Sequence, residues 1–293
     1  MADAVEVVVN AGAEHGEGAI WHAQTHRFYW VDIMKGLVYI YDPAANTNRA
    51  INVGQPVGTV VPRRSGGLML AVERGFAALD LETEALTILA DPADRAPRTR
   101  FNDGKCDPAG RFWAGTMSYD SGVIGAGALY CLDADHKVWP RVANVSIANG
   151  IVWTKDKRTM YFIDTLAYTL DRFDYDHATG QISNRRPLIC FPETQGFPDG
   201  MAIDAEDKVW VAVMGSGRVF RYDPESAALL STVELPTPQI TSCAFGGPNL
   251  DELYITSSTL GLSPEALAND PLAGVLFKAR PGVQGVPADE YAG

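Results

Sequence analysis

Acidic and amide side chains stand directly before a glycine at several widely separated points of this chain. The groups are Glu17-Gly18, Asn102-Asp103-Gly104, Asn149-Gly150 and Asp199-Gly200, and each glycine opens a short apolar run. Carboxylate and amide oxygens are hard ligands that suit Ca²⁺, Mg²⁺ or Mn²⁺ and that Zn²⁺ or Fe²⁺ also accept. If the fold brings these side chains together, they form a site for one divalent metal ion.

Each of these groups, taken alone, has a simpler explanation. Asn and Asp before Gly are common turn residues, because they accept left-handed backbone geometry and hydrogen-bond to their own backbone. Glu17 has no special role in turns, however, and the four groups recur at the same phase of a repeat. The recurrence therefore favours a metal site over four unrelated turns.

The elements that must position these residues follow from an internal repeat. Its units begin near Gly18, Gly58, Gly104, Gly150, Gly200 and Ser242. Successive starts are about 40 to 50 residues apart, and each unit holds short β-branched and aromatic runs separated by turn residues. Such a period is typical of a β-propeller with one four-stranded blade per repeat. The sequence therefore predicts an all-β fold, a six-bladed β-propeller of four-stranded antiparallel blades, as a single domain over residues 1–293.

Closure of the ring predicts where the N-terminal strand pairs. An open ring leaves an exposed sheet edge, so residues 5–9 are expected to complete the blade that begins at Ser242. The innermost strands of a propeller line a central channel. The acidic and amide residues are expected directly ahead of these strands, facing one another at one mouth of the channel. A short turn of helix is expected only at residues 263–268.

Composition and charge exclude several classes of function. The net charge of -12 argues against a nucleic-acid partner, because binding phosphates requires a basic surface. No apolar run reaches the roughly 18 residues of a membrane span, and Asp3 and Glu6 stand where a signal peptide carries basic residues. We therefore expect a cytoplasmic protein without a membrane partner. The sequence has no C-x-x-C pair, no G-x-S-x-G and no H-E-x-x-H motif.

Several blocks of the sequence resemble the SMP-30/gluconolactonase/regucalcin family, and the likeness covers nearly the whole chain. The blocks are residues 16–21, 100–105, 107–111, 115–117, 148–150, 198–201 and 241–247. The resemblance implies a six-bladed propeller that hydrolyses sugar lactones with one divalent metal ion, with Ca²⁺ as the first choice. By motif it assigns Glu17, Asn149 and Asp199 as metal ligands, with Asp199 also the general base.

The same resemblance assigns substrate contacts. Arg100 and Asn102 match substrate-binding positions, and Asp120 stands where the family often has a glutamate that holds sugar hydroxyls. His15, two residues before Glu17, and Tyr119 are further candidates near the mouth. The expected substrate is a five- or six-membered aldonolactone, a small-molecule partner. The sequence makes no prediction of the oligomeric state.

Two other functions stay open from the sequence. A propeller can be a non-catalytic metal-binding or scaffold protein, because a fold does not fix a function. It can also be a hydrolase of phosphotriesters or other esters that uses similar metal chemistry. The gathering of carboxylates, amides and Arg100 at one channel mouth is what separates an enzyme from a scaffold.

Overall fold

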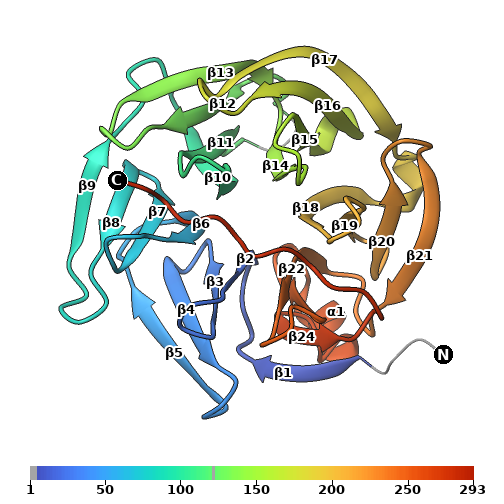
Figure 1. The fold of residues 1–293 in the computed structure, drawn as a ribbon. Helices are drawn as coiled ribbons and strands as arrows, with labels where there is room; N and C mark the ends of the chain where they lie inside the picture. The colour runs from blue at the N-terminus through green and yellow to red at the C-terminus, as the bar shows by residue number, and fades with distance from the viewer. Residues whose placement is uncertain (1–4, 121–122) are drawn as a thin grey trace.

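The computed structural model describes residues 5–120 and 123–293, and it shows six four-stranded antiparallel sheets arranged as blades around a central axis (Figure 1). The predicted six-bladed propeller is therefore confirmed. Blade 1 consists of β2 (Gly16–His22), β3 (Arg27–Asp32), β4 (Leu37–Asp42) and β5 (Thr47–Asn52). Blade 2 consists of β6 (Val57–Pro62), β7 (Leu68–Val72), β8 (Gly75–Leu79) and β9 (Leu86–Ala90). Blade 3 consists of β10 (Thr99–Cys106), β11 (Phe112–Ser118), β12 (Gly127–Leu132) and β13 (Val138–Val145).

The second half of the ring repeats this order. Blade 4 consists of β14 (Ala148–Trp153), β15 (Thr159–Asp164), β16 (Thr169–Asp176) and β17 (Gln181–Cys190), with the 3₁₀ turn η1 (Thr165–Ala167) after β15. Blade 5 consists of β18 (Phe197–Ile203), β19 (Val209–Met214), β20 (Arg218–Asp223) and β21 (Ala228–Glu234), preceded by η2 (Glu193–Gln195). Blade 6 consists of β22 (Ile240–Gly246), β23 (Glu252–Ser257), β24 (Val275–Ala279) and β1 (Glu6–Asn10).

The N-terminal strand closes the ring as predicted. β1 pairs antiparallel with β24, with Glu6 opposite Lys278 and Asn10 opposite Val275, so the first and last strands of the chain share one sheet. The first strand of every other blade is the innermost one, and β22 takes that place in blade 6 (Figure 1). Six inner strands therefore surround one channel.

Aromatic side chains fill the space between neighbouring blades. Trp113 of blade 3 meets Trp153 of blade 4 edge to face, with ring centroids 5.8 Å apart. Trp210 of blade 5 meets Phe245 of blade 6 in the same way at 5.6 Å. Trp113 and Trp210 are fully buried, and edge-to-face aromatic pairs add to the free energy of burial. This packing fixes the blades against one another and so fixes the inner strands.

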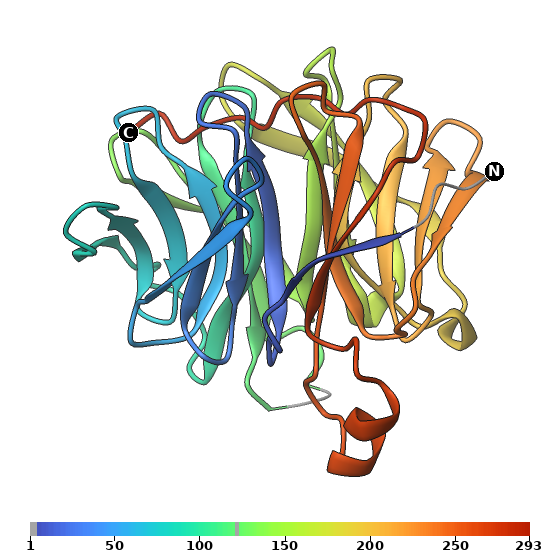
Figure 2. The ribbon, with the colours of Figure 1, turned by 90° about the horizontal axis from the view of Figure 1, so that it is seen from below.

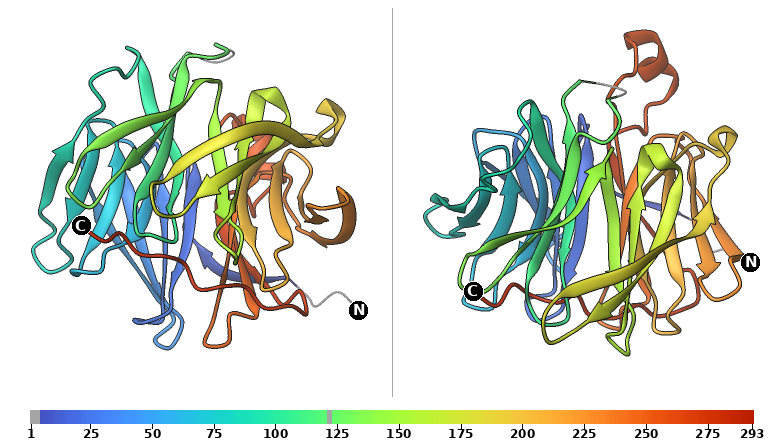
Figure 3. Two further views of the ribbon diagram at one scale, coloured as in Figure 1. Left: turned by 45° about the horizontal axis from the view of Figure 1, so that its top comes forward. Right: turned by 90° about the horizontal axis from the view of Figure 1, so that it is seen from above.

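The two faces of the ring differ (Figures 2 and 3). The connection between β23 and β24 projects from one face and carries the only α-helix of the described chain, α1 (Pro264–Asn269). Ser263 caps this helix by accepting a hydrogen bond from the Ala266 N–H at 3.1 Å, close to where the sequence places a turn of helix. None of the helices in the described ranges has the length and apolar character needed to span a bilayer.

The opposite face is crossed by the C-terminal segment, residues 280–293 (Figure 1). Its backbone forms hydrogen bonds with several blades. Gly285 N–H donates to Leu250 O of blade 6 at 2.8 Å, and Tyr291 N–H donates to Pro62 O of blade 2 at 2.9 Å. Ala292 N–H then reaches Gly110 O of blade 3 at 2.9 Å. The segment therefore ties blade 6 to blades 2 and 3 across the axis.

Candidate active site

The candidate residues lie within the innermost strands, which corrects the prediction that they precede them. Glu17 is on β2, Asn102 on β10, Asn149 on β14 and Asp199 on β18. In each of these blades, the pairing of the inner strand with the second strand begins ahead of the glycine and then shifts register. The register breaks lie between Glu17 and Ile20, Phe101 and Gly104, Ala148 and Ile151, and Pro198 and Met201. Bulges of this kind re-aim side chains and are frequent next to active sites.

Gly150 and Gly200 are required for a different reason from the turn that an Asn-Gly or Asp-Gly pair commonly makes. A Cβ atom on Gly150 would lie 2.5 Å from the Cβ of Met201 on the neighbouring inner strand. A Cβ on Gly200 would collide with Ser242 Oγ of blade 6. Glycine is therefore required here because the inner strands of adjacent blades approach closely, and not because the chain turns.

A cavity of about 320 Å³ lies at the end of the channel on the face that carries α1. Its polar lining includes His15, Arg100, Asn102, Asn149, Asp199 and, at the rim, Asp120. Apolar side chains complete the wall, among them Phe197, the first residue of β18, and Leu260 of the connection between β23 and β24. The cavity thus gathers residues from blades 1, 3, 4, 5 and 6.

Oxygen atoms without partners meet beneath this cavity. Glu17 Oε1 and Asn149 Oδ1 are buried and accept no hydrogen bond within the described part of the chain. The carboxyl groups of Glu17 and Asp199 are close enough to share a proton, and Asn149 also lies within reach of Asp199. Buried polar atoms are nearly always paired, so unpaired carboxylate and amide oxygens of this kind are suited to ligate a cation. Glu17, Asn149 and Asp199 therefore fit one divalent ion.

The donor set is two carboxylates and one amide. Within residues 5–120 and 123–293, His, Cys, Asp and Glu side chains alone form no group of three that could hold a metal. An ion at this site would take its third protein ligand from the amide oxygen of Asn149. Such an all-oxygen set suits Ca²⁺ or Mg²⁺ better than a soft ion.

A hydrogen-bond chain fixes the orientation of the Asn149 amide. Thr165 Oγ1 donates to Pro198 O at 2.8 Å, so it must accept from Asn149 Nδ2, which lies 3.0 Å away. The amide oxygen of Asn149 is thereby turned toward the other candidate ligands. Thr165, the first residue of η1, was not predicted from the sequence, because its role depends on a contact between two blades.

Arg100 and Asn102 form a second linked unit. Arg100 Nη1 donates to Asn102 Oδ1 at 2.8 Å and to Phe101 O at 3.0 Å, while Asn102 Nδ2 donates to Ala148 O at 2.9 Å. Both side chains are buried. The guanidinium keeps Nε and Nη2 without partners in the described residues, so these N–H groups are available to a ligand in the cavity.

Asp120 and Tyr119 lie farther from the centre. Asp120 forms a two-bond ion pair with Arg98, at 2.6 and 2.9 Å, and about half of its side chain is exposed. Tyr119 donates its hydroxyl hydrogen to Glu73 Oε1 at 3.0 Å and does not line the cavity. The role of Asp120 toward a substrate remains a prediction.

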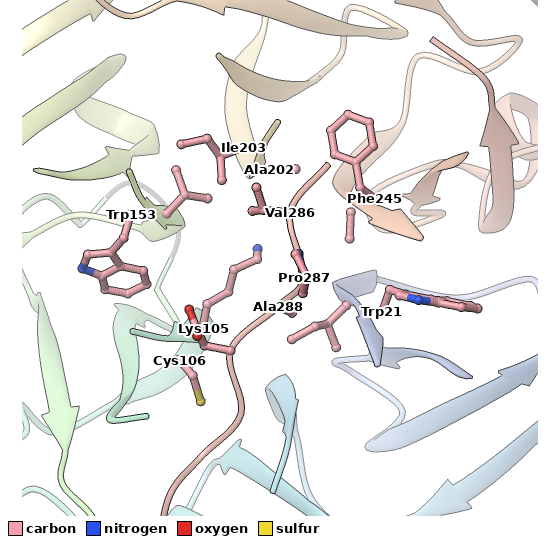
Figure 4. A pocket seen from close by; sticks show the side chains of 14 residues that line it. Trp21, Lys105, Cys106, Trp153, Ala202, Ile203, Phe245, Val286, Pro287 and Ala288 are labelled. Carbon is pink, nitrogen blue, oxygen red and sulfur yellow. The ribbon is translucent and has the colours of Figure 1, made fainter. Parts of the chain in front are cut away.

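A second cavity of about 90 Å³ lies at the other end of the channel, under the C-terminal segment (Figure 4). Figure 4 shows Lys105 reaching in among Trp153, Val286 and Pro287. The Lys105 ammonium donates to Met201 O at 3.0 Å. None of the candidate metal ligands lines this cavity, whereas Asn149 and Asp199 line the cavity on the α1 face.

Residues 15–259 match the family described as SMP-30/gluconolactonase/LRE-like region. This match covers every inner strand and every candidate residue. The chain belongs to the SMP-30/gluconolactonase/LRE-like family.

Relatives in this family span the whole chain. The chain is 44% identical to regucalcin of Danio rerio over 292 residues and 40% identical to regucalcin of Homo sapiens over 294 residues, with 99% of this chain and 98% of each relative covered. Among solved structures, a luciferin-regenerating enzyme matches with a TM-score of 0.92 at 35% identity over 99% of both chains. Regucalcin from Agrobacterium tumefaciens, described as a calcium-binding protein, matches with a TM-score of 0.93 at 28% identity over 99% of this chain and 97% of that one.

Burial and like charge control the titration of this family member's site. Burial raises the pKa of Glu17 well above its ordinary value, and the neighbouring Asp199 and Asp103 raise it further. Burial likewise raises the pKa of Asp199 to about 8. The two carboxyl groups therefore hold a proton near neutral pH in the metal-free protein, and a bound cation would displace it.

His15 is held neutral beside them. Burial lowers the pKa of His15 to about 3, and the charge of Arg100 lowers it further. Ser258 Oγ donates to Glu14 O at 2.8 Å, so His15 Nδ1, 2.9 Å from that hydroxyl oxygen, carries the ring hydrogen and donates to it. The other ring nitrogen, Nε2, is then an acceptor on the wall of the cavity.

The metal-free protein is expected to lose stability as the pH rises from 6.5 to about 8, the folded pKa of Asp199. A carboxyl group whose folded pKa is raised favours the folded state when protonated, and this stability is lost as the pH passes from the unfolded to the folded pKa. His15 has the opposite sign but stops contributing above its unfolded value of 6.5. We expect Tm to fall by about 2–5 °C over this window in scanning calorimetry with a chelator.

Saturating Ca²⁺ should flatten this dependence, because the ion keeps both carboxylates ionised. The variant Glu17→Gln, which removes one of the coupled groups, should flatten it without any ion. An identical slope in wild type and Glu17→Gln would show that other groups cause the pH dependence.

Proposed function

We propose that this protein hydrolyses a sugar lactone to its aldonic acid with the help of one divalent metal ion, Ca²⁺ in first place. The observation that carries the proposal is the meeting of Glu17, Asn149 and Asp199 beneath one cavity, with unpartnered oxygens beside an available Arg100 guanidinium. A scaffold propeller has no need of buried carboxylates that repel one another.

Glu17, Asn149 and Asp199 would hold the ion. When bound, a divalent cation supplies Lewis acidity that polarises the lactone carbonyl and offsets the charge that develops on its oxygen. Asp199, which lines the cavity, takes a proton from the attacking water as general base. Opening of the ring needs no covalent intermediate with the protein.

Arg100 orients the substrate. Its Nε and Nη2 donate to the ring or hydroxyl oxygens of the lactone, while Asn102 holds the guanidinium through its amide oxygen. Asn102 is itself anchored to Ala148 O, next to Asn149, so the substrate-binding and metal-binding units share one support. Asp120 at the rim accepts from sugar hydroxyls if its ion pair with Arg98 opens.

The size of the cavity supports a small substrate. About 320 Å³ is at the lower end of the range for ligand pockets and fits a five- or six-membered lactone. A gluconolactonase of Xanthomonas campestris shares the fold, with a TM-score of 0.74 at 18% identity over 94% of this chain and 89% of that one. Aldonolactones are therefore the first substrates to try.

A pH-indicator assay over gluconolactone, galactonolactone, xylonolactone and arabinonolactone tests the proposal. We expect hydrolysis of at least one lactone well above the spontaneous rate. Stripping the metal with a chelator should lower that rate by about 100-fold or more, because it removes carbonyl polarisation worth several kcal/mol. Adding back Ca²⁺, Mg²⁺, Mn²⁺ or Zn²⁺ singly should restore it to different extents.

The controls separate loss of the ion from loss of the fold. Circular dichroism of the stripped protein should keep its β-sheet spectrum, because the blades are held by their own packing. Full lactonase activity after verified removal of the metal would overturn the mechanism. A phosphotriester in the same panel tests the other ester class, and its selective hydrolysis would replace the sugar lactone as substrate.

A further inference from the structure

A buried carboxylate anchors the chain just ahead of Glu17. Asp32, the last residue of β3, accepts hydrogen bonds from Glu14 N–H at 2.8 Å and His15 N–H at 3.1 Å. The N–H of Ile33, the next residue, donates to His15 O at 3.0 Å. We call this arrangement of one aspartate and three bonds an Asp clasp. It holds the two residues that lie three and two positions before Glu17.

Blade 4 repeats the Asp clasp ahead of Asn149. Asp164, the last residue of β15, accepts from Ser146 N–H at 3.0 Å and from Ile147 N–H at 3.2 Å. The N–H of Thr165 donates to Ile147 O at 3.1 Å. The held residues again lie three and two positions before the candidate ligand. The two clasps therefore use the same offsets along the chain.

The other blades, as far as the structure describes them, lack this carboxylate. Their second strands β7, β11, β19 and β23 end at uncharged residues, namely Val72, Ser118, Met214 and Ser257. In blades 2 and 6 one backbone bond ties the same region, from Glu73 N–H to Pro56 O at 2.9 Å and from Ser258 N–H to Gln239 O at 2.8 Å. Closing a blade in this propeller therefore does not require an Asp clasp.

Each clasp lowers the free energy of unfolding unless its hydrogen bonds offset the burial of its carboxylate. Asp32 is fully buried and Asp164 is 3% exposed. No cationic side chain among the described residues pairs with Asp164, and Asp32 has only Lys35, at 3.4 Å and largely in solvent. Burying a carboxylate costs free energy that hydrogen bonds must offset. The two blades that bear this cost are the ones that carry Glu17 and Asn149.

We propose that Asp32 and Asp164 are positioning residues that aim Glu17 and Asn149 at the metal ion. Gly16 pairs with Asp32 and Ala148 with Asp164 at the start of each ladder, and the register then breaks between Glu17 and Ile20 in blade 1 and between Ala148 and Ile151 in blade 4. Each ligand thus lies at or inside a bulge, and the clasp is its upstream support. Partners that orient metal ligands commonly change metal affinity by 10- to 100-fold. This inference rests on the proposed metal site.

The test compares Asp164→Asn with Asp204→Asn. Asp204 is also fully buried and accepts two backbone N–H groups, from Glu206 at 2.9 Å and Lys208 at 3.0 Å. It also accepts from Trp210 and Arg221, but it follows β18 at the end of the channel away from the cavity. The control variant Asp204→Asn therefore disturbs at least as many hydrogen bonds as Asp164→Asn, but at a residue that supports no candidate metal ligand.

Calorimetric titration of chelator-stripped protein with Ca²⁺ measures the Kd, which tests the positioning role. We expect Asp164→Asn to raise Kd by about 10-fold or more, because one clasped N–H would face an amide NH₂. Asp204→Asn should lower the Tm of the metal-free protein at least as far and leave Kd within about twofold. Asp32→Asn provides an independent clasp variant if Asp164→Asn does not fold.

The outcomes are distinct. Wild-type Kd values in both clasp variants, or an equal rise in the Asp204→Asn control, overturn the positioning role while leaving the proposed function intact. If wild type itself binds no Ca²⁺, Mg²⁺, Mn²⁺ or Zn²⁺, the metal site is wrong and the positioning role fails with it.

Discussion

Replacing Asp199 by asparagine is expected to lower kcat for lactone hydrolysis by about 10³-fold. Asn keeps the size of the side chain and one oxygen for the ion, but it cannot accept a proton from water. General-base catalysis contributes about 10²- to 10⁴-fold, and Asp199 is the base candidate that lines the cavity. The measurement is kcat on the best lactone of the panel with the restoring ion at saturation.

Two controls distinguish loss of the general base from loss of the fold and from loss of the metal ion. Asp204→Asn, at the other end of β18, should retain most of the wild-type kcat despite a lower Tm. Calorimetry should show that Asp199→Asn still binds the ion, although more weakly. A variant that binds the ion and hydrolyses the lactone at the wild-type rate would exclude Asp199 as the base.

The architecture could be predicted from the sequence because it repeats. Residues at the same phase of each unit must occupy equivalent places in a ring, so the recurrence of Glu17, Asn149 and Asp199 before glycine predicted their meeting. The need to avoid an open sheet edge was enough to assign the N-terminal strand to the last blade. Both inferences use geometry that every unit shares.

The supporting contacts could not be predicted in the same way. Thr165 orients Asn149 by bonding to Pro198 of the next blade, and no pattern within one unit reveals a contact between two. The Asp clasp is also invisible to a repeat search, because within residues 5–120 and 123–293 it occurs in two units out of six. The requirement for glycine at position 150 could not be predicted either, because it depends on how closely Met201 approaches from the neighbouring strand.

Replacing Glu17 by glutamine is expected to change metal affinity and stability in opposite directions. Loss of a carboxylate ligand should raise the Kd for Ca²⁺ by about 100-fold, because carboxylate charge is a main determinant of calcium affinity. The metal-free variant should nevertheless unfold at a higher temperature than wild type at pH 8. Gln removes a buried carboxyl group whose ionisation is opposed by burial and by the charges of Asp199 and Asp103.

This opposition of signs is what distinguishes a ligand from a structural residue. A structural Glu17 would lose Tm on substitution and leave Kd unchanged, as expected for Asp204→Asn. A carboxylate ligand held beside other carboxylates lowers the stability of the metal-free protein and raises the stability of the metal-bound protein. Such a loss of stability is often found at functional sites. Calorimetric Kd and the Tm at pH 8, both on stripped protein, decide between them. Unchanged Ca²⁺ affinity in Glu17→Gln would remove it from the metal site.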